Sequence, residues 1–297
     1  PPPFSSTSRQ TRFGFKSRGL GDVYKRQGEI SAETLSKLAK TLCSTPLCDD
    51  LLVVQDSTMA DARLRIVGAD GREAEFCANG LLYVSSKIGE ELGRDAVTIE
   101  TPAGVRRATC EDGEWQAEVG VATRLDLETA LSGKVPVLGL LRAGEPHLVL
   151  DRPEALPGFN LDRGQFEHYC SPLRDHFDIP GGVNVTVVFQ QREDNVLIRT
   201  FERGVQRHTL SCGTGAVAAV VAIFGTPDRA RRFHVCSPGG RHSIYFDGEH
   251  WHLAARPVRI GSGVLRDGQL CLPLERLQHY RVEPGSLSSS KQQAEQQ

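Results

Sequence analysis

The sequence lacks any apolar run long enough to cross a membrane. Its longest run, residues 216–224, is far shorter than the roughly 20 residues that a spanning helix needs. Residues 1–27 lack the apolar core of a signal peptide, so we expect a cytoplasmic protein. Excess charge is lacking too, since the net charge is −2 and the pI is near 6.6. These values give no electrostatic footprint for binding nucleic acid or a membrane surface.

Cysteine pairs with metal-ligand spacing are also lacking. Eight cysteines are scattered along the chain, and only Cys43 and Cys48 lie close together. A C-x4-C pair without a second pair does not define a zinc site. Four histidines gather between residues 234 and 252, near a turn rich in Gly and Asp, and we interpret them as polar residues of an exposed hairpin. We therefore expect reduced thiols and no bound metal.

Two cysteines that precede glycine-containing turns are the most informative feature that is present. Cys77 precedes the tripeptide Ala-Asn-Gly, Cys212 precedes Gly-Thr-Gly, and an apolar stretch of helical length follows each. A helix N-terminus offers free N–H groups and partial positive charge, so it binds an anion and lowers the pKa of a thiol. Two such ends facing each other would hold a carboxylate between two acid/base thiols. On these residues alone, two buried structural thiols stay an open alternative, because free cysteine is often buried.

The order strand, cysteine, helix occurs twice along the chain, which indicates two α/β halves of similar design with a cleft between them. The second helix is apolar on every side, so we expect a sheet to wrap around it. We expect the following divisions: a poorly patterned N-terminal segment at 1–27, a first half at 28–122 plus 268–283, a second half at 123–267, and a disordered tail at 284–297.

Several motifs carry a resemblance to a known family. Residues 68–80 (G-A-D-G-R-E-A-E-F-C-A-N-G) resemble the N-A-D-G-S-E-x-x-x-C-G-N-G segment of diaminopimelate epimerases. Residues 199–204 and 209–216 resemble the segment R-x-x-E-R-G-x-G-E-T-x-A-C-G-T-G-A of that family. Between them, Gln206-Arg207-His208 stand where the family has G-E, so this loop is one residue longer. Residues 144–147 (G-E-P-H) look like its G-N-P-H motif, and residues 182–185 (G-V-N-V) like its G-x-N-V motif. All landmarks occur in order between about residues 30 and 272.

The resemblance implies an α/β fold of two pseudo-symmetric domains, each a mixed or antiparallel sheet wrapped around a central helix. It implies that Cys77 and Cys212 are an acid/base pair in an isomerase that needs no pyridoxal phosphate and no other cofactor. It places His147 and Glu202 near the substrate ammonium group, supporting the cysteines. The substrate-binding residues that it implies are Ala78, Asn79, His147, Asn184, Glu202, Arg203, Gly213 and Thr214. A homodimer is a further expectation from the family.

Departures from the family pattern cluster where the far end of diaminopimelate would bind. Gly68 stands where the family has Asn, Glu145 replaces the Asn of G-N-P-H, and Asp50 replaces a common Gly. Losing an amide and gaining carboxylates disfavours a distal carboxylate and favours a cationic group. We therefore expect a racemase or epimerase of a free amino acid with a basic or imidazole side chain.

Three alternatives stay open at this point. One is a diaminopimelate epimerase proper that has diverged in sequence. Another is a fold relative that isomerises a double bond or acts on a hydroxyproline-like ring, although the Glu202-Arg203-Gly204 segment favours the epimerase branch. The last is a non-catalytic or redox relative in which the two cysteines pair as a disulfide.

Overall fold

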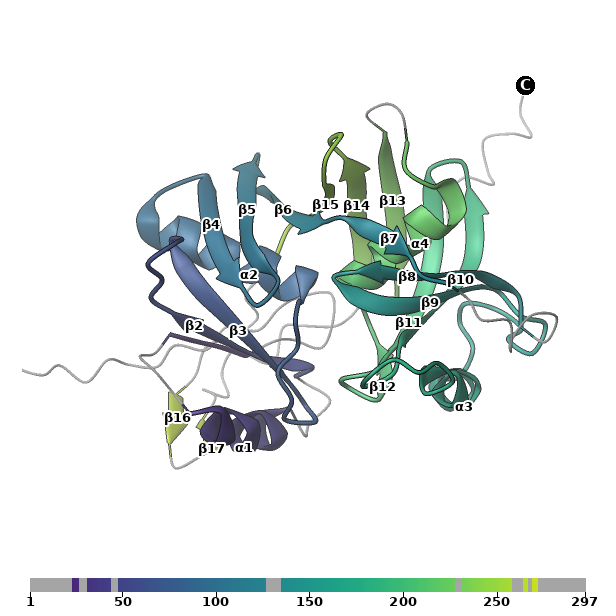
Figure 1. The fold of residues 1–297 in the computed structure, drawn as a ribbon, viewed down its shortest axis with the longest axis horizontal. Coiled ribbons are helices and arrows are strands. Elements are labelled where there is room, and N and C mark those ends of the chain that lie inside the picture. The colour runs from purple at the N-terminus through teal and green to yellow at the C-terminus, as the bar shows by residue number, and fades with distance from the viewer. Residues whose placement is uncertain are drawn as a thin grey trace, which may run out of the picture.

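Two halves, each containing a helix enclosed by strands, lie side by side (Figure 1). The structure, a computed structural model, describes residues 23–26, 31–43, 48–126, 135–227, 231–257, 264–266 and 269–271. The α/β fold with two pseudo-symmetric halves confirms the fold class that the sequence predicts. No helix in these ranges is long and apolar enough to span a membrane.

Among the described residues, the first half contains two helices and six strands. Its elements are β1 (Val23–Arg26), α1 (Ala32–Leu42), β2 (Asp50–Gln55), β3 (Ala62–Gly68), α2 (Ala78–Leu92), β4 (Ala96–Thr101), β5 (Gly104–Glu111) and β6 (Glu114–Gly120). Ser31 caps α1 by accepting a hydrogen bond from the backbone N–H of Thr34, as its position in the sequence predicts. Helix α2 ends at Gly93, whose φ of 63° is the left-handed conformation typical of a helix C-terminus.

The second half repeats this plan with an added pair of strands at its start. Its elements are β7 (Ala122–Arg124), β8 (Val137–Ala143), β9 (Glu145–Asp151), α3 (Arg163–Arg174), β10 (Asn184–Arg192), β11 (Asn195–Glu202), β12 (Arg207–Thr209), α4 (Gly213–Phe224), β13 (Arg232–Ser237), β14 (Gly240–Phe246) and β15 (Trp251–Ala255). A hairpin of β16 (Val264–Arg266) and β17 (Gln269–Cys271) lies beside α1 of the first half (Figure 1).

Strand pairing makes the repeat explicit. β1 is parallel to β2 and connected to it through α1, β2 pairs antiparallel with β3, and β3 is parallel to β4 and connected to it through α2. The second half has the same sequence of pairings, because β9 is parallel to β10 across α3, β10 is antiparallel to β11, and β11 is parallel to β13 across α4. In each half an antiparallel meander follows, β4–β5–β6 or β13–β14–β15. α2 and α4, and hence the two cysteines that precede them, therefore hold equivalent positions.

The halves are joined through their sheets as well as through the chain. β6 pairs antiparallel with β15, so one continuous path of hydrogen-bonded strands runs through both halves. α2 packs mainly on β4 and β6, whereas α4 packs on β8 to β11 and β13 to β15. Residues 213–221 of α4 are all buried, which confirms the prediction of a helix wrapped by sheet.

Part of the chain differs from what the sequence pattern predicts. Val23–Arg26 form β1, although they belong to a segment that we expected to be poorly patterned. Their pairing with the buried strand β2 supplies backbone hydrogen bonds that a pattern of side chains does not reveal. Residues 1–22 and the tail at 284–297 lie outside the described residues, and the domain boundaries stay predictions.

Candidate active site

A pocket of about 360 Å³ is lined by residues of both halves. This volume lies at the lower end of the range of small-molecule sites. Of the thirteen site residues named from the sequence, twelve line it and His147 does not. Those twelve are Asp50, Gly68, Cys77, Ala78, Asn79, Glu145, Asn184, Glu202, Arg203, Cys212, Gly213 and Thr214.

The two cysteines cap the N-termini of the two enclosed helices. The Sγ atom of Cys77 accepts a hydrogen bond from the backbone N–H of Gly80 at 3.2 Å, at the start of α2. The Sγ atom of Cys212 accepts one from the N–H of Gly215 at 3.4 Å, at the start of α4. Both helix starts were predicted from the sequence and are confirmed. The geometry therefore directs two helix N-termini, with their free N–H groups and positive dipole ends, at one pocket.

The two helix N-termini are packed against each other. The Asn79 side chain donates a hydrogen bond from Nδ2 to the main-chain oxygen of Ser211 at 3.0 Å, which links the first turn of α2 to the residue before Cys212. A Cβ atom at Gly213 would lie only 3.0 Å from the Cβ atom of Ala78 and 2.9 Å from Oδ1 of Asn79. Glycine at position 213 is thus a requirement of this close approach rather than of backbone flexibility.

Cys212 lies in surroundings that keep its proton in place. Burial raises the pKa of the Cys212 thiol well above its ordinary value, and the negative charge of Glu202 raises it further. Hydrogen bonds from Thr214 and Gly215 act in the opposite direction but do not outweigh burial. Cys212 is therefore a thiol near neutral pH. Cys77 is only partly buried.

His147 is fully buried and lies behind the pocket lining, on β9. Its Nε2 atom is 2.9 Å from Oγ1 of Thr214, and that oxygen is 3.4 Å from Sγ of Cys212. Burial, together with the charge of Arg203, lowers the pKa of His147 to about 3, so the imidazole is neutral at physiological pH. His147 thus contacts Thr214, whose hydroxyl lies beside Cys212, and the pocket lining does not include His147.

Glu145 and Arg203 form an ion pair in the pocket lining. The guanidinium of Arg203 also donates from Nη1 to the main-chain oxygens of Gly182 at 2.9 Å and Pro180 at 3.3 Å. The backbone N–H of Arg203 donates to Oδ1 of Asn184 at 2.8 Å. Both ends of Arg203 are thus held by the protein itself.

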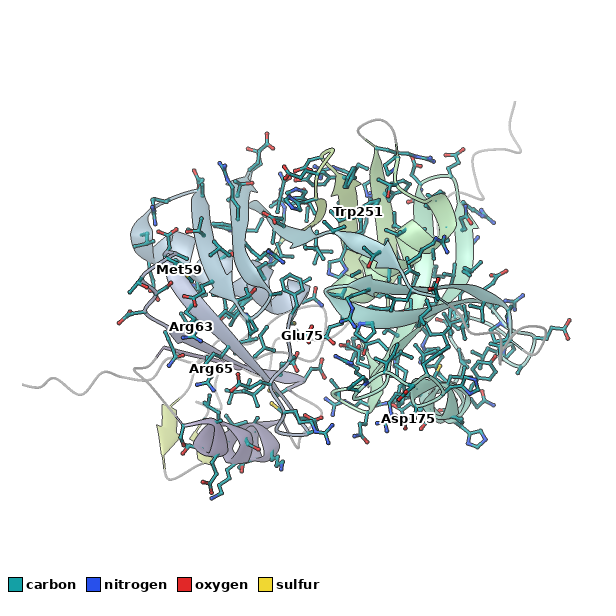
Figure 2. The ribbon with its side chains drawn as sticks, viewed as in Figure 1. Met59, Arg63, Arg65, Glu75, Asp175 and Trp251 are labelled. Carbon is teal, nitrogen blue, oxygen red and sulfur yellow. The ribbon has the colours of Figure 1, made fainter. Side chains whose placement is uncertain are left out.

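Acidic side chains outnumber basic ones around the pocket. Its lining contains seven carboxylates (Asp49, Asp50, Asp70, Glu73, Glu75, Glu145 and Glu202) and two guanidiniums (Arg72 and Arg203). Five of these side chains were not predicted as site residues from the sequence, although four of them belong to the motif at residues 68–80: Asp49, Asp70, Arg72, Glu73 and Glu75. Glu75 lies between the two halves in Figure 2. Its side chain is 66% exposed, so its ion pair with Arg142 at 3.7 Å neutralises it only weakly.

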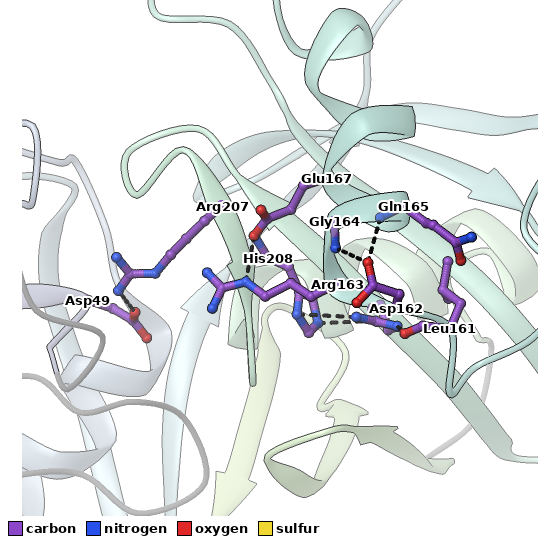
Figure 3. A network of polar contacts seen from close by, with 10 residues as sticks. Asp49, Leu161, Asp162, Arg163, Gly164, Gln165, Glu167, Arg207 and His208 are labelled. Carbon is purple, nitrogen blue, oxygen red and sulfur yellow. Dashed lines mark hydrogen bonds and ion pairs between the residues drawn. The ribbon is translucent and has the colours of Figure 1, made fainter.

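One contact that the sequence did not reveal bridges the halves beside the pocket. Arg207 on β12 donates to Oδ1 of Asp49 at 2.6 Å and to the main-chain oxygen of Cys48 at 3.2 Å (Figure 3). The next residue, His208, donates its backbone N–H to Glu167 on α3. Arg207 lies in the loop that is one residue longer than the family segment, and that insertion was the only signal in the sequence.

No metal centre accompanies these groups in the described part of the chain, where no cluster of three or more His, Cys, Asp or Glu residues could hold an ion. Cys43 and Cys48 lie together, with 2.7 Å between their Sγ atoms, in a buried cluster beside α1. Two of the clustered histidines make ordinary polar contacts: Nε2 of His252 contacts Oδ2 of Asp247, and Nδ1 of His234 lies 3.4 Å from Oγ of Ser243.

Solved structures that match this fold include a hydroxyproline epimerase and a PhzF-family protein. A hydroxyproline epimerase from Agrobacterium vitis matches with a TM-score of 0.62 at 17% identity, covering 86% of this chain and 92% of that one. A PhzF-family phenazine biosynthesis protein from Bacillus anthracis matches with a TM-score of 0.61 at 14% identity, covering 87% and 100%. At these identities the likeness shows the fold alone.

Curated relatives add the sequence comparison. A diaminopimelate epimerase of Chlamydia muridarum is 32% identical over 212 residues, covering 67% of this chain and 75% of that protein. One of Methanothrix thermoacetophila is 30% identical over 276 residues, covering 85% and 95%. No family model matches the chain. With the fold, these relatives define the protein as an isomerase of the epimerase and racemase class.

Within that class, the chain belongs to the diaminopimelate epimerase family.

Proposed function

We propose that this protein inverts the α-carbon of a free amino acid with a basic or imidazole side chain, using Cys77 and Cys212 as a thiolate and thiol pair. The observation that carries the proposal is that each cysteine caps the N-terminus of an enclosed helix at one shared pocket. Helix N-termini bind anions, so this is where an α-carboxylate is best stabilised.

The difficult step is removal of the α-proton, because negative charge then builds up beside a carboxylate. Backbone N–H groups at residues 78, 79, 213 and 214, with the two helix dipoles, stabilise that charge. The thiolate of one cysteine takes the proton from one face, breaking the Cα–H bond. The thiol of the other cysteine donates its proton to the opposite face of the carbanion, forming a new Cα–H bond and leaving a thiolate.

The surroundings of Cys212 support its role as the proton donor for one enantiomer. Its raised pKa keeps it protonated, and the neutral His147 fixes the hydroxyl of Thr214 beside it. Cys77 then acts as the base in that direction. After one turnover the protonation states are exchanged, which is the state required for the opposite enantiomer.

The excess of carboxylates around the pocket supports a basic side chain on the substrate. Seven carboxylates and two guanidiniums line the pocket, and Arg207 and Arg65 pair with Asp49 and Glu73 from outside that lining. An excess of negative charge remains, which attracts a cation and repels a second carboxylate. Glu202 and the other pocket carboxylates supply acceptors for the ammonium group.

Diaminopimelate epimerase activity is the second candidate function, and the names of the relatives favour it. Turnover of L-lysine, L-histidine and meso-diaminopimelate, followed by chiral chromatography, separates the two. We expect racemisation of lysine or histidine with a kcat/KM at least about tenfold above that for diaminopimelate, which is a difference of about 1.4 kcal/mol. A higher kcat/KM for diaminopimelate would contradict the proposal of a basic substrate.

The same assay tests the non-catalytic or redox alternative. That alternative predicts that the fully reduced protein inverts no amino acid. It also predicts that Cys77 and Cys212 pair as a disulfide when the protein is oxidised. Inversion by the reduced protein would exclude it.

A further inference from the structure

The ion pair between Glu145 and Arg203 occupies the one guanidinium that the second half contributes to the described pocket lining. The guanidinium of Arg203 also donates hydrogen bonds to the main-chain oxygens of Gly182 and Pro180, and its backbone N–H donates one to the side chain of Asn184. A guanidinium is a strong binder of carboxylates when its donors are open to a ligand. Here they are directed to groups of the protein, so a ligand carboxylate that binds Arg203 would have to displace Glu145; the other guanidinium of the described lining, Arg72, comes from the first half.

Glu145 is well placed to resist that displacement. It is the first residue of β9, it is only 7% exposed, and its carboxylate lies in the pocket lining. Removing Arg203 from it would leave a buried carboxylate without its counter-ion, which costs more than losing an exposed pair. A second carboxylate arriving from a ligand would add like-charge repulsion with Glu145, whose pKa burial and the nearby charge of Glu75 already raise.

The pocket also shows which hydrogen-bonding groups a ligand should bring. Among the described lining residues, two buried side-chain atoms have no hydrogen-bond partner, Oε1 of Glu145 and Oδ1 of Asn79. Both are acceptors. A ligand therefore gains most by bringing donors to both, whereas a carboxylate brings only acceptors.

We propose that Glu145 determines substrate choice by serving as the built-in counter-ion of Arg203, so that the site selects amino acids with one carboxylate and a distal cation and rejects dicarboxylates. This inference rests on the proposed function, whose substrate class it narrows and assigns to one residue. Glu145 excludes the distal carboxylate through its charge, and its unpartnered oxygen favours a distal donor.

The test compares two ligands that differ by a single carboxylate, L-lysine and meso-diaminopimelate, with binding measured by calorimetry. The wild-type protein is expected to bind lysine at least about tenfold more tightly. In Glu145→Gln the charge is removed at nearly constant shape, Arg203 becomes available, and the ratio should shift toward diaminopimelate by at least about tenfold. Glu145→Asn, with a shorter amide, provides the same comparison if the glutamine variant does not fold.

Two matched variants isolate the cause. Glu145→Asp retains the negative charge and should retain the preference for lysine. Glu75→Gln removes one charge from the same lining without touching Arg203, and the ratio should change by less than about threefold. Equal wild-type binding of the two ligands, or an unchanged ratio in both amide variants, would overturn the proposal.

Binding and catalysis separate this inference from the proposed function. A reversed binding preference in Glu145→Gln, with no α-proton exchange by the wild-type protein, would support the role of Glu145 and refute the racemase. Exchange of the α-proton by the wild-type protein, with an unchanged binding ratio in Glu145→Gln, would support the racemase and refute the role of Glu145.

Discussion

At the scale of single residues, Glu202 and Cys212 show how one charge sets a protonation state. The carboxylate of Glu202 receives a hydrogen bond from the hydroxyl of Thr209 and raises the pKa of the Cys212 thiol, after burial itself. A negative charge disfavours a neighbouring thiolate, so removing it must lower the pKa of that thiol. The sign is independent of the remaining burial.

We expect Glu202→Gln to increase the rate at which Cys212 is alkylated by iodoacetamide at a given pH between 7 and 9. Only the thiolate reacts, and the lowered pKa of Cys212 enlarges its share by about tenfold for each unit of change. Mass spectrometry of the peptide containing Cys212, in a Cys77→Ala background, measures that rate. Thr209→Val loses the hydrogen bond but keeps the charge, so it should leave the pH profile in place. An unchanged or upward-shifted profile in Glu202→Gln would contradict this electrostatic account.

Single residues were also where prediction from sequence had its limits. Cys77 and Cys212 could be found because a cysteine before small residues and an apolar run marks a helix start. His147 could be found only through the motif at residues 144–147, and its fully buried place behind Thr214 depends on β9 and α4 coming together. The contact of Arg207 with Asp49 joins residues from different halves, so no local pattern contains it.

At the scale of elements, the N-termini of α2 and α4 form the central unit of the site. Gly213 lies where the two helices touch, and a side chain there would meet Leu253 at 2.7 Å as well as Ala78 and Asn79. Because packed protein interiors have little free space, the methyl group of an alanine at position 213 would move α4 relative to α2.

Gly213→Ala is expected to lower kcat/KM by about a hundredfold, because a displacement near 1 Å misplaces the thiol and the carboxylate-binding N–H groups. Overpacking should also lower the free energy of unfolding by about 1–3 kcal/mol. Racemisation kinetics and urea unfolding measure the two effects. Gly158→Ala is the matched control, because nothing lies within 4 Å of its added Cβ atom. Activity near the wild-type level in Gly213→Ala would show that the helix contact does not set the geometry of the site.

The elements themselves were largely readable from the sequence. Ser31, Cys77 and Gly93 act as the caps that their positions indicate, and the apolar character of residues 216–224 predicted enclosure of α4. β1 was not predicted, because its place follows from pairing with β2 rather than from its own side chains.

At the scale of the whole molecule, the repeated order of strands and helices explains why two cysteines meet at one pocket. Each half delivers one helix N-terminus, and the β6–β15 pairing and the Asp49–Arg207 contact hold the halves together on either side. The sequence predicted two similar halves but not these joining contacts, since they depend on register between distant strands. A site built from two equivalent ends suits a reaction that treats both faces of one carbon alike.

The most direct test of the two-thiol account is α-carbon exchange in deuterated water, with the pure L and D forms of lysine or histidine as substrates. The wild-type protein should place deuterium at the α-carbon of the product enantiomer, while substrate that has not yet turned over keeps its protium. Both Cys77→Ala and Cys212→Ala should abolish inversion, because each removes the proton carrier of one face. Racemisation by the Cys77→Ala protein at the wild-type rate would contradict the account.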